Sequence, residues 1–132
     1  MTEMDPVVHF EMPYQDSTRV ASFYSQAFGW QMQQLGKEMG EYILAGTIET
    51  DEDHMLLRSG GINGGFFPKG PDMPQCPSVV IAVGDIRQAI KKVSDAGGSI
   101  LGELVLISGI GMYVAIIDTE GNRVGVLEPI NP

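Results

Sequence analysis

Apolar and polar positions follow the same order twice along the chain. The run Val7–Pro13 alternates apolar and polar residues, and after Asp16 the apolar residues recur three and four positions apart until residue 28. The run Ser78–Val83 is rich in β-branched residues, and after Asp85 a second pattern with helical spacing begins. A period of two residues predicts strands, and a period of 3.6 predicts helices. The pattern therefore predicts a strand followed by a helix, in duplicate.

Further alternating runs follow each predicted helix. We expect strands at Trp30–Leu35, Glu41–Ile48 and Ile62–Phe67 in the first half, and at Ser99–Ile107, Met112–Asp118 and Arg123–Glu128 in the second. The fold predicted is α+β, with two tandem β-α-β-β-β modules. They span residues 6–68 and 78–132, and the proline-rich segment 69–77 joins them as a short semi-rigid linker. Aligning the module ends places Phe67 opposite Glu128, which leaves the polar stretch Glu49–His54 as an insertion in the first module.

Two glycine pairs, at 60–61 and 64–65, lie around the last strand of the first module. They do not match a phosphate-binding loop, because no Lys-Ser/Thr follows and no helix begins there. We expect them to permit sharp bending or close backbone approach.

Four stretches together resemble the vicinal oxygen chelate superfamily, which groups glyoxalase I, bleomycin-resistance proteins and extradiol dioxygenases. They are STRVASFYSQAFGW (17–30), INGGFFP (62–68), VVIAVGDIRQAIKKVSDAGG (79–98) and IDTEGNRVGVLEP (117–129). The resemblance covers nearly the whole chain and implies a single domain, 1–132, built from mixed curved sheets. It also implies a small-molecule cavity between those sheets and a homodimer. The superfamily includes metal-dependent lyases, isomerases and oxygenases as well as non-catalytic binders.

Charge and composition limit the binding partners, the cysteine chemistry and the cellular location that we expect. The chain has 17 acidic and 8 basic residues and a formal net charge of -9, which disfavours nucleic acid and anionic membrane surfaces. A single cysteine, Cys76, excludes an internal disulfide and a multi-cysteine zinc site. Because the sequence shows neither a signal-peptide pattern nor a long apolar run, we expect a cytoplasmic protein.

The resemblance implies four places for a divalent metal ligand, which fall here at His9, Phe67, Ser78 and Glu128. Phenylalanine cannot bind a metal, and a neutral serine hydroxyl is a poor ligand for zinc, nickel, manganese or iron. Only His9 and Glu128 remain as metal ligands, and the sole other histidine, His54, lies in the insertion. We therefore expect no tightly bound metal of the family's usual type.

Strand alternation places His9 and Glu11 on the side of the first strand opposite Phe10, and we interpret that side as facing the cavity. Glu128 is interpreted in the same way. Three readings stay open for His9 and Glu128: a hydrogen-bonded acid/base pair with a catalytic role, a weak or substrate-completed metal site, and two unconnected polar residues. Glu11 lies near the strand end, so we expect it to be exposed.

Four residues are candidates for contact with a ligand: Phe67, Ser78, Met112 and Tyr113. For Tyr113 a core position is the favoured alternative to a hydroxyl directed into a pocket. Two functions from different classes stay open, the first based on His9 and Glu128 and the second on the loss of metal ligands at Phe67 and Ser78. The first is a glyoxalase-like lyase, isomerase or dioxygenase-type enzyme with a reduced or absent metal site. The second is a non-catalytic binder that sequesters a small molecule, similar to bleomycin-resistance proteins, for which the acidic net charge favours cationic compounds.

Overall fold

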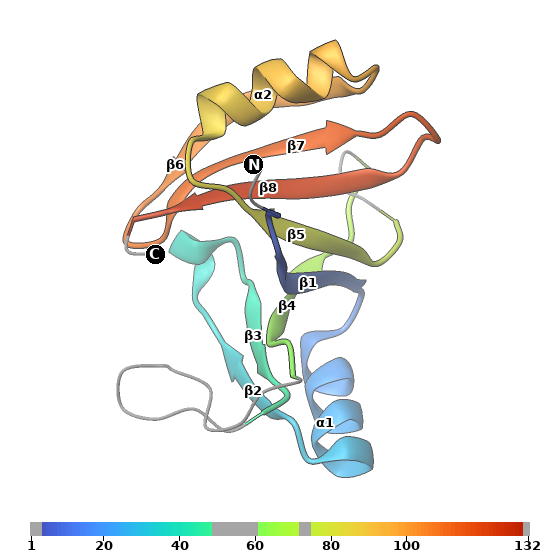
Figure 1. The fold of residues 1–132 in the computed structure, drawn as a ribbon. Helices are drawn as coiled ribbons and strands as arrows, with labels where there is room; N and C mark the ends of the chain where they lie inside the picture. Colours follow the sequence, from blue (N-terminus) through green and yellow to red (C-terminus); the bar gives the residue numbers. More distant parts are fainter. Residues whose placement is uncertain (1–3, 49–60, 72–74, 131–132) are drawn as a thin grey trace. The chain divides into compact units, whose positions relative to one another are not determined.

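A computed structural model of the chain describes residues 4–48, 61–71 and 75–130, which fall into two compact units (Figure 1). The N-terminal unit is His9–Pro77, and the C-terminal unit consists of Met1–Val8 and Ser78–Pro132. The residues before His9 join the C-terminal unit, where the Pro6 carbonyl accepts a hydrogen bond from the Ala82 amide at 3.0 Å. No helix in the described ranges is both long and apolar enough to cross a membrane.

The N-terminal unit has the predicted β-α-β-β-β order with one additional 3-10 turn. Its elements are β1 (Val7–Tyr14), α1 (Ser17–Phe28), β2 (Gln31–Gln34), η1 (Lys37–Met39), β3 (Ile43–Gly46) and β4 (Gly64–Pro68). The strands lie side by side in the order β2-β3-β4-β1. β1 runs parallel to β4, and the other neighbours are antiparallel. The predicted insertion Glu49–His54 lies outside the described residues.

Polar and glycine caps define the two ends of α1. The Asp16 carboxylate accepts a hydrogen bond from the Arg19 amide at 2.9 Å and satisfies one of the free N–H groups of the first turn. Gly29 ends the helix in the left-handed region, with φ of 73°. Both boundaries agree with the sequence prediction.

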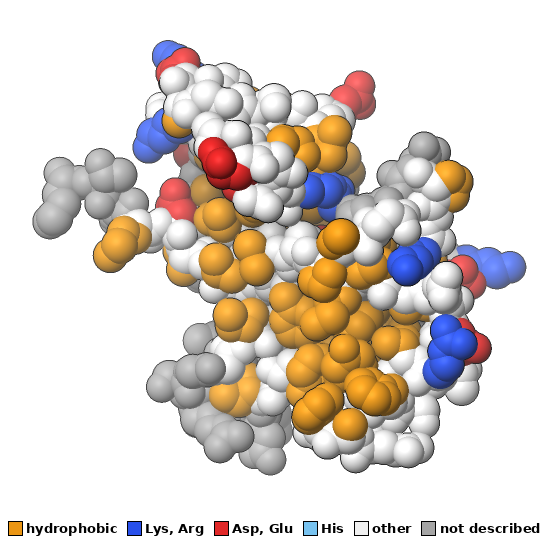
Figure 2. Space-filling view, turned by 90° about the vertical axis from the view of Figure 1, so that its right-hand side faces the viewer, with side chains coloured by type: hydrophobic (Ala, Val, Ile, Leu, Met, Phe, Trp, Pro, Cys, Tyr) orange, Lys and Arg blue, Asp and Glu red, His pale blue; other side chains and the backbone are white. Residues whose placement is uncertain are grey.

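Phe66 is the largest fully buried side chain among the described residues of the N-terminal unit, with 1% of its surface exposed. It packs with Ile43, and Val20 and Tyr24 of α1 pack against this core. Two further residues of the predicted helix face, Phe23 and Phe28, remain 56% and 64% exposed. Figure 2 views the side on which α1 lies in Figure 1 and shows hydrophobic side chains at the surface there. The apolar stripe of α1 is therefore wider than the surface that the strands cover.

The C-terminal unit repeats the arrangement. Its elements are β5 (Ser78–Ala82), α2 (Ile86–Asp95), β6 (Ser99–Ile107), β7 (Gly111–Ile117) and β8 (Arg123–Pro129). The strand order is β5-β8-β7-β6, with β5 parallel to β8. The Asp85 carboxylate caps α2 by accepting from the amides of Arg87 and Gln88. The sequence therefore predicted every long element, and the structure confirms the α+β fold with two β-α-β-β-β modules.

α2 lies over one face of the C-terminal strands (Figure 1), and the side chains between them form a second core. Ile86 of α2 packs there against Val114 and Val126, and none of the three side chains is more than 4% exposed. Because side chains alternate along a strand, the position of Val126 identifies the helix-facing side of β8. This assignment decides the orientation of Glu128.

Truncating Phe66 tests the core of the N-terminal unit. Phe66→Ala removes a fully buried ring and leaves a cavity, so we expect the free energy of unfolding to fall by about 3–5 kcal/mol. Phe23→Ala removes the same atoms from an exposed site and serves as the control, with an expected loss below about 1 kcal/mol. Urea unfolding followed by circular dichroism measures both values, and equal losses would contradict this description of the core.

Candidate functional site

The two faces of β1 carry different chemistry. Phe10 and Met12 pack with the core under α1, so His9 and Glu11 lie on the opposite face, as predicted. Neither polar side chain is fully exposed: His9 and Glu11 are both partly buried. The expectation that Glu11 is exposed is therefore wrong, and its carboxylate is in contact with a tyrosine that lies just before β3.

Tyr42 links the two polar residues of β1. Its hydroxyl lies 3.1 Å from His9 Nε2 and donates a hydrogen bond to Glu11 Oε2 at 3.0 Å. Three side chains of the N-terminal unit thus form a continuous chain, His9–Tyr42–Glu11. Tyr42 was not among the residues predicted from the sequence; it directly precedes β3 and shares a face with Leu44 two positions later.

The backbone before Tyr42 is held in place by its own contacts. Glu41 has a positive φ of 55°, an uncommon conformation for a residue other than glycine. The buried Tyr14 hydroxyl donates a 2.6 Å hydrogen bond to the Glu41 carbonyl, and the Leu35 amide donates to the Tyr42 carbonyl at 2.8 Å. These bonds fix the direction in which the chain delivers the Tyr42 ring.

Two adjacent glycines of β4 make room for aromatic rings on its two faces. A Cβ atom on Gly64 would come within 2.5 Å of the Phe10 ring, and one on Gly65 would overlap the Tyr42 ring. Neither glycine has a positive φ, so both are needed for space rather than for backbone conformation. The sequence predicted close approach at Gly64-Gly65, and the approaching groups are side chains rather than backbone.

Burial controls the protonation of His9. The loss of solvent around the imidazole lowers the pKa of His9 from its ordinary value of 6.5. The ring is therefore mainly neutral at pH 7, with one nitrogen protonated and the other available to accept a proton. A neutral, partly buried imidazole in a hydrogen-bonded chain can act as a general base.

Phe67 belongs to the same face of the N-terminal unit. Its neighbour Phe66 points into the core, so Phe67 points to the opposite side of β4. Gly65, two positions earlier, belongs to that same side, and it is paired with Glu11 of β1. Phe67 is buried, with 6% of its surface exposed. An apolar wall thus lies on the face that carries His9, which fits the predicted contact with a ligand.

Glu128 does not have the orientation that the sequence predicted. Its Oε1 accepts a hydrogen bond from the Ile86 amide at 2.9 Å, at the first residue of α2. Glu128 and Val126 lie two positions apart on β8, and Val126 packs under α2. The carboxylate therefore lies on the helix side, where it satisfies an orphan amide and the positive end of the helix dipole.

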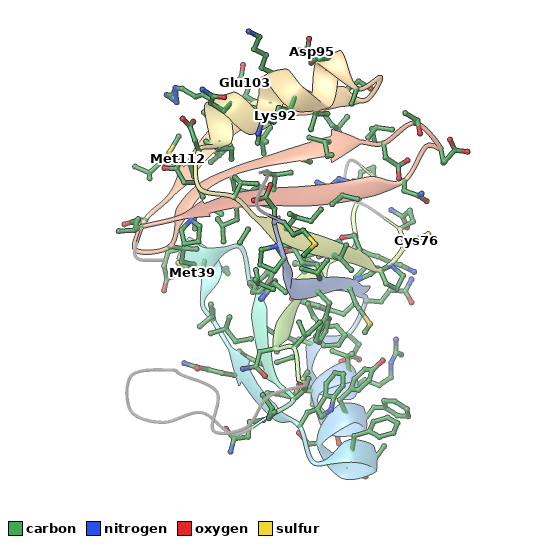
Figure 3. All side chains as sticks on the ribbon, viewed as in Figure 1. Met39, Cys76, Lys92, Asp95, Glu103 and Met112 are labelled. Carbon is green, nitrogen blue, oxygen red and sulfur yellow. The ribbon has the colours of Figure 1, made fainter. Side chains whose placement is uncertain are left out.

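The error arose from the alignment of the two modules. The alignment of Phe67 with Glu128 uses an odd offset, whereas the two core residues Phe66 and Val126 differ by an even number of positions. A shift of one residue moves a strand side chain to the other face. The prediction for Met112 is also wrong, because Met112 is paired with Glu128 across β7 and β8 and packs with the core under α2 (Figure 3).

The remaining predicted residues lie in the C-terminal unit. Ser78 is the first residue of β5 and is partly buried. Tyr113 points to the face opposite Met112, and a Cβ atom on Gly125 would lie 2.7 Å from its hydroxyl. A tyrosine lying over a strand glycine thus occurs in both modules, as Tyr42 over Gly65 and as Tyr113 over Gly125.

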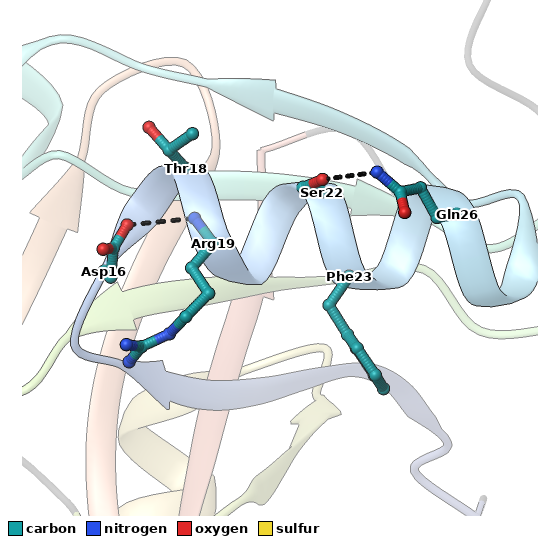
Figure 4. A pocket seen from close by; sticks show the side chains of 6 residues that line it. All are labelled: Asp16, Thr18, Arg19, Ser22, Phe23 and Gln26. Atoms are coloured by element: carbon teal, nitrogen blue, oxygen red, sulfur yellow. Dashed lines mark hydrogen bonds between the residues drawn. The ribbon is translucent and has the colours of Figure 1, made fainter.

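A surface hollow beside α1 lies away from this chemistry. It is lined by residues from the cap and the outer side of the helix: Asp16, Thr18, Arg19, Ser22, Phe23 and Gln26 (Figure 4). Its polar groups are partly engaged with one another, since the Gln26 amide donates to the Ser22 hydroxyl at 2.8 Å. The helix packs on the face of the strands opposite His9, so we assign this hollow no role in the site.

Comparison with known proteins identifies the family. The sequence model of the Glyoxalase/Bleomycin resistance protein/Dioxygenase superfamily matches residues 7–126. The chain belongs to this superfamily. A search of curated protein sequences gave no match.

Solved structures of the superfamily fold are similar over nearly the whole chain. A hypothetical protein, BH1468, from Bacillus halodurans C-125 has a TM-score of 0.70 and 13% identity, with 98% of each chain covered. Methylmalonyl-CoA epimerase from Mycobacterium tuberculosis has a TM-score of 0.68 and 12% identity, covering 98% of this chain and 93% of that one. A superfamily member from Vibrio splendidus 12B01 has a TM-score of 0.60 and 14% identity, with 95% and 99% covered. At these identities the likeness shows the fold alone.

The side chains present do not fit the superfamily's usual metal centre. Phe67 offers no ligand atom, and Glu128 is bonded to the first amide of α2. Within the described ranges, no group of three or more His, Cys, Asp or Glu side chains is arranged to hold a metal ion. His54 lies outside those ranges. His9 is thus the one residue of the four expected positions that has both a suitable donor atom and a suitable orientation.

The lowered pKa of His9 predicts a pH dependence of stability. Between the folded pKa and 6.5 the unfolded chain binds more protons at His9 than the folded chain does, so folding weakens as pH falls through this range. Glu11 and Tyr42 face the imidazole and are retained in His9→Gln. We expect wild-type unfolding free energy to fall more steeply than that of His9→Gln between pH 6.5 and 5. Parallel slopes in urea titrations across this range would contradict the assignment.

The contact of Glu128 with α2 predicts a structural effect. Glu128→Ala leaves the Ile86 amide without its acceptor, so we expect a loss of about 1 kcal/mol in unfolding free energy. Glu128→Gln keeps an acceptor oxygen and should lose less. Urea unfolding measures both variants, and a stability of Glu128→Ala equal to that of wild type would show that the bond contributes nothing.

Proposed function

We propose that this chain is a small-molecule enzyme of the isomerase or lyase type that uses His9 as a metal-independent general base. The observation that supports this most directly is the hydrogen-bonded chain His9–Tyr42–Glu11 on the face of the strands opposite α1. Burial keeps the imidazole neutral and able to accept a proton, and the carboxylate at the other end of the chain would stabilise the imidazolium that forms.

The chemistry expected of such a site is proton abstraction and return. A base that removes a proton next to a carbonyl and returns it elsewhere interconverts isomers, and the same first step initiates many eliminations. The fold is compatible with this class, since methylmalonyl-CoA epimerase shares it. The side-chain atoms at the family's four metal positions give no support for a metal-assisted route.

The charges of the site favour a neutral or cationic ligand. Glu11 brings a carboxylate to the same face as His9, and the chain carries a net charge of -9. A polyanionic ligand would be repelled by both. Leu44, which is 38% exposed, provides apolar surface on this face for the body of the ligand, and the buried ring of Phe67 lies on the same face. A homodimer in the cytoplasm, expected from the family resemblance and the sequence, remains part of this proposal.

Deuterium uptake tests the proposal with a panel of compounds, so the substrate need not be identified first. The purified protein would be incubated in D2O with methylglyoxal–thiol adducts, catechols, uncharged α-hydroxy ketones and methylmalonyl-CoA, and exchange would be measured by mass spectrometry. We expect catalysed exchange with an uncharged carbonyl compound, unaffected by EDTA. His9→Gln should slow it by roughly 10²–10⁴-fold, the usual contribution of a general base.

Glu128→Gln is the matched control, because that carboxylate lies on the helix side. Exchange by this variant should equal that of wild type. Exchange that survives in His9→Gln, or that requires added zinc, nickel, manganese or iron, would refute the proposal.

A non-catalytic binder is the second candidate, supported by the buried aromatic ring of Phe67 on the site face. In this case the protein would hold a ligand without exchanging its protons. Isothermal titration calorimetry with the same compounds and with cationic drugs would then detect binding that Phe67→Ala weakens and His9→Gln leaves nearly unchanged. Binding without any exchange favours the binder, and His9-dependent exchange favours the enzyme.

A further inference from the structure

The Tyr42 hydroxyl carries a single proton and lies within hydrogen-bond distance of both His9 Nε2 and Glu11 Oε2. An ionised glutamate accepts hydrogen bonds only, and a bond to a charged acceptor is stronger than one to a neutral acceptor. The proton of Tyr42 therefore lies toward Glu11 Oε2, as the 3.0 Å contact is directed. The oxygen then presents a lone pair to His9 Nε2 at 3.1 Å, and a hydrogen bond at that distance requires Nε2 to carry a hydrogen.

We propose that Tyr42 is a positioning residue that holds His9 in the Nε2–H tautomer and so makes Nδ1 the proton-accepting atom. This inference rests on the proposed role of His9 as a base and goes beyond it by naming the atom and the residue that selects it. Among the residues that the structure describes, none hydrogen-bonds to Nδ1. That nitrogen keeps its lone pair for a ligand.

Gly65 leaves the space over β4 that this arrangement needs. Tyr42 starts beside β3, and His9 lies on β1, with β4 paired between those two strands. The two outer strands are about two strand spacings apart, roughly 10 Å, so the Tyr42 side chain must cross β4 for its hydroxyl to meet His9. It crosses at Gly65, where any Cβ atom would overlap the ring. The absence of a side chain at one position of β4 thus decides the tautomer of a residue on another strand.

The proton transfer balances without a further reactant. The ligand's C–H bond breaks, its electron pair stays on the ligand as an enolate, and the proton forms a bond with Nδ1. The imidazolium keeps its Nε2–H bond to Tyr42, and the Glu11 carboxylate at the end of the chain stabilises the positive charge. Return of the Nδ1 proton to the enolate regenerates the neutral histidine and releases the isomer.

Long-range proton–nitrogen NMR correlations of histidine distinguish the two tautomers directly. In uniformly ¹⁵N-labelled wild-type protein above pH 7, we expect His9 to show one protonated nitrogen, Nε2. Tyr42→Phe keeps the ring and removes the hydroxyl, so His9 should relax toward the mixture of tautomers found in solvent-exposed histidine. A wild-type Nδ1–H tautomer, or an unchanged pattern in Tyr42→Phe, would overturn the inference.

Three glycine variants distinguish the loss of the space over Gly65 from general damage to the fold. Gly65→Ala displaces Tyr42 and should reproduce the NMR change of Tyr42→Phe. Gly46→Ala adds the same methyl group on β3, where the nearest atom is 3.6 Å away, and should leave His9 as in wild type. Gly64→Ala places a methyl group against the Phe10 ring in the core, so it should lower the free energy of unfolding without changing the tautomer of His9. A tautomer shift in Gly64→Ala as large as in Gly65→Ala would overturn the proposed role of Gly65.

The outcomes for the two proposals are separable. The fixed tautomer with a Tyr42-dependent shift but no deuterium exchange would refute the proposed enzyme and leave the positioning role standing. His9-dependent exchange together with an Nδ1–H tautomer would support the enzyme and refute the positioning role. If Gly65→Ala fails to fold, as judged by circular dichroism, Tyr42→Phe alone decides, because it adds no atoms.

Discussion

The arrangement of the N-terminal unit depends on two adjacent residues without side chains. Phe10 lies over Gly64 on the core face of β4, and Tyr42 lies over Gly65 on the other face. The first contact lets the core close under α1, where Phe66 is buried. The second lets a tyrosine hydroxyl from beside β3 reach the two polar residues of β1. Packing and candidate chemistry are thus set by neighbouring positions of one strand, on opposite faces.

The carboxylates near the two helices and strands have different roles according to the face on which each lies. Asp85 and Glu128 both face the first turn of α2 and satisfy its amides, so these carboxylates stabilise the fold. Glu11 shares a face with His9, and the Tyr42 hydroxyl links its carboxylate to the imidazole. The family's metal positions hold an aromatic ring at Phe67 and a helix-bound carboxylate at Glu128, and for this reason we propose proton transfer as the role of His9.

Much of the fold could be predicted from the sequence, because strand and helix periods, Asp16 and Asp85 as caps, and the glycine at position 29 all act locally. Face assignments on β1 were also correct, since Phe10 and Met12 are apolar and His9 and Glu11 are polar. Glu128 was misplaced because the apolar residues of β8 occupy both faces, so alternation alone gave no direction. An alignment of the modules that ignored the two-residue period then chose the wrong face.

Tyr42 could not be predicted as part of the site, because its contacts join residues far apart in sequence. The available signal was the pair Gly64-Gly65 in a predicted strand, which indicates that something lies close to that backbone. Deciding which ring lies there required the register of β1, β3 and β4.

Neutron diffraction from a deuterium-exchanged crystal grown above pH 7 would test the central claim most directly, because it locates each exchangeable hydrogen. We expect deuterium on His9 Nε2, none on Nδ1, and the Tyr42 hydroxyl deuterium directed at Glu11 Oε2. Deuterium on Nδ1, with the Tyr42 hydroxyl donating to Nε2, would contradict it.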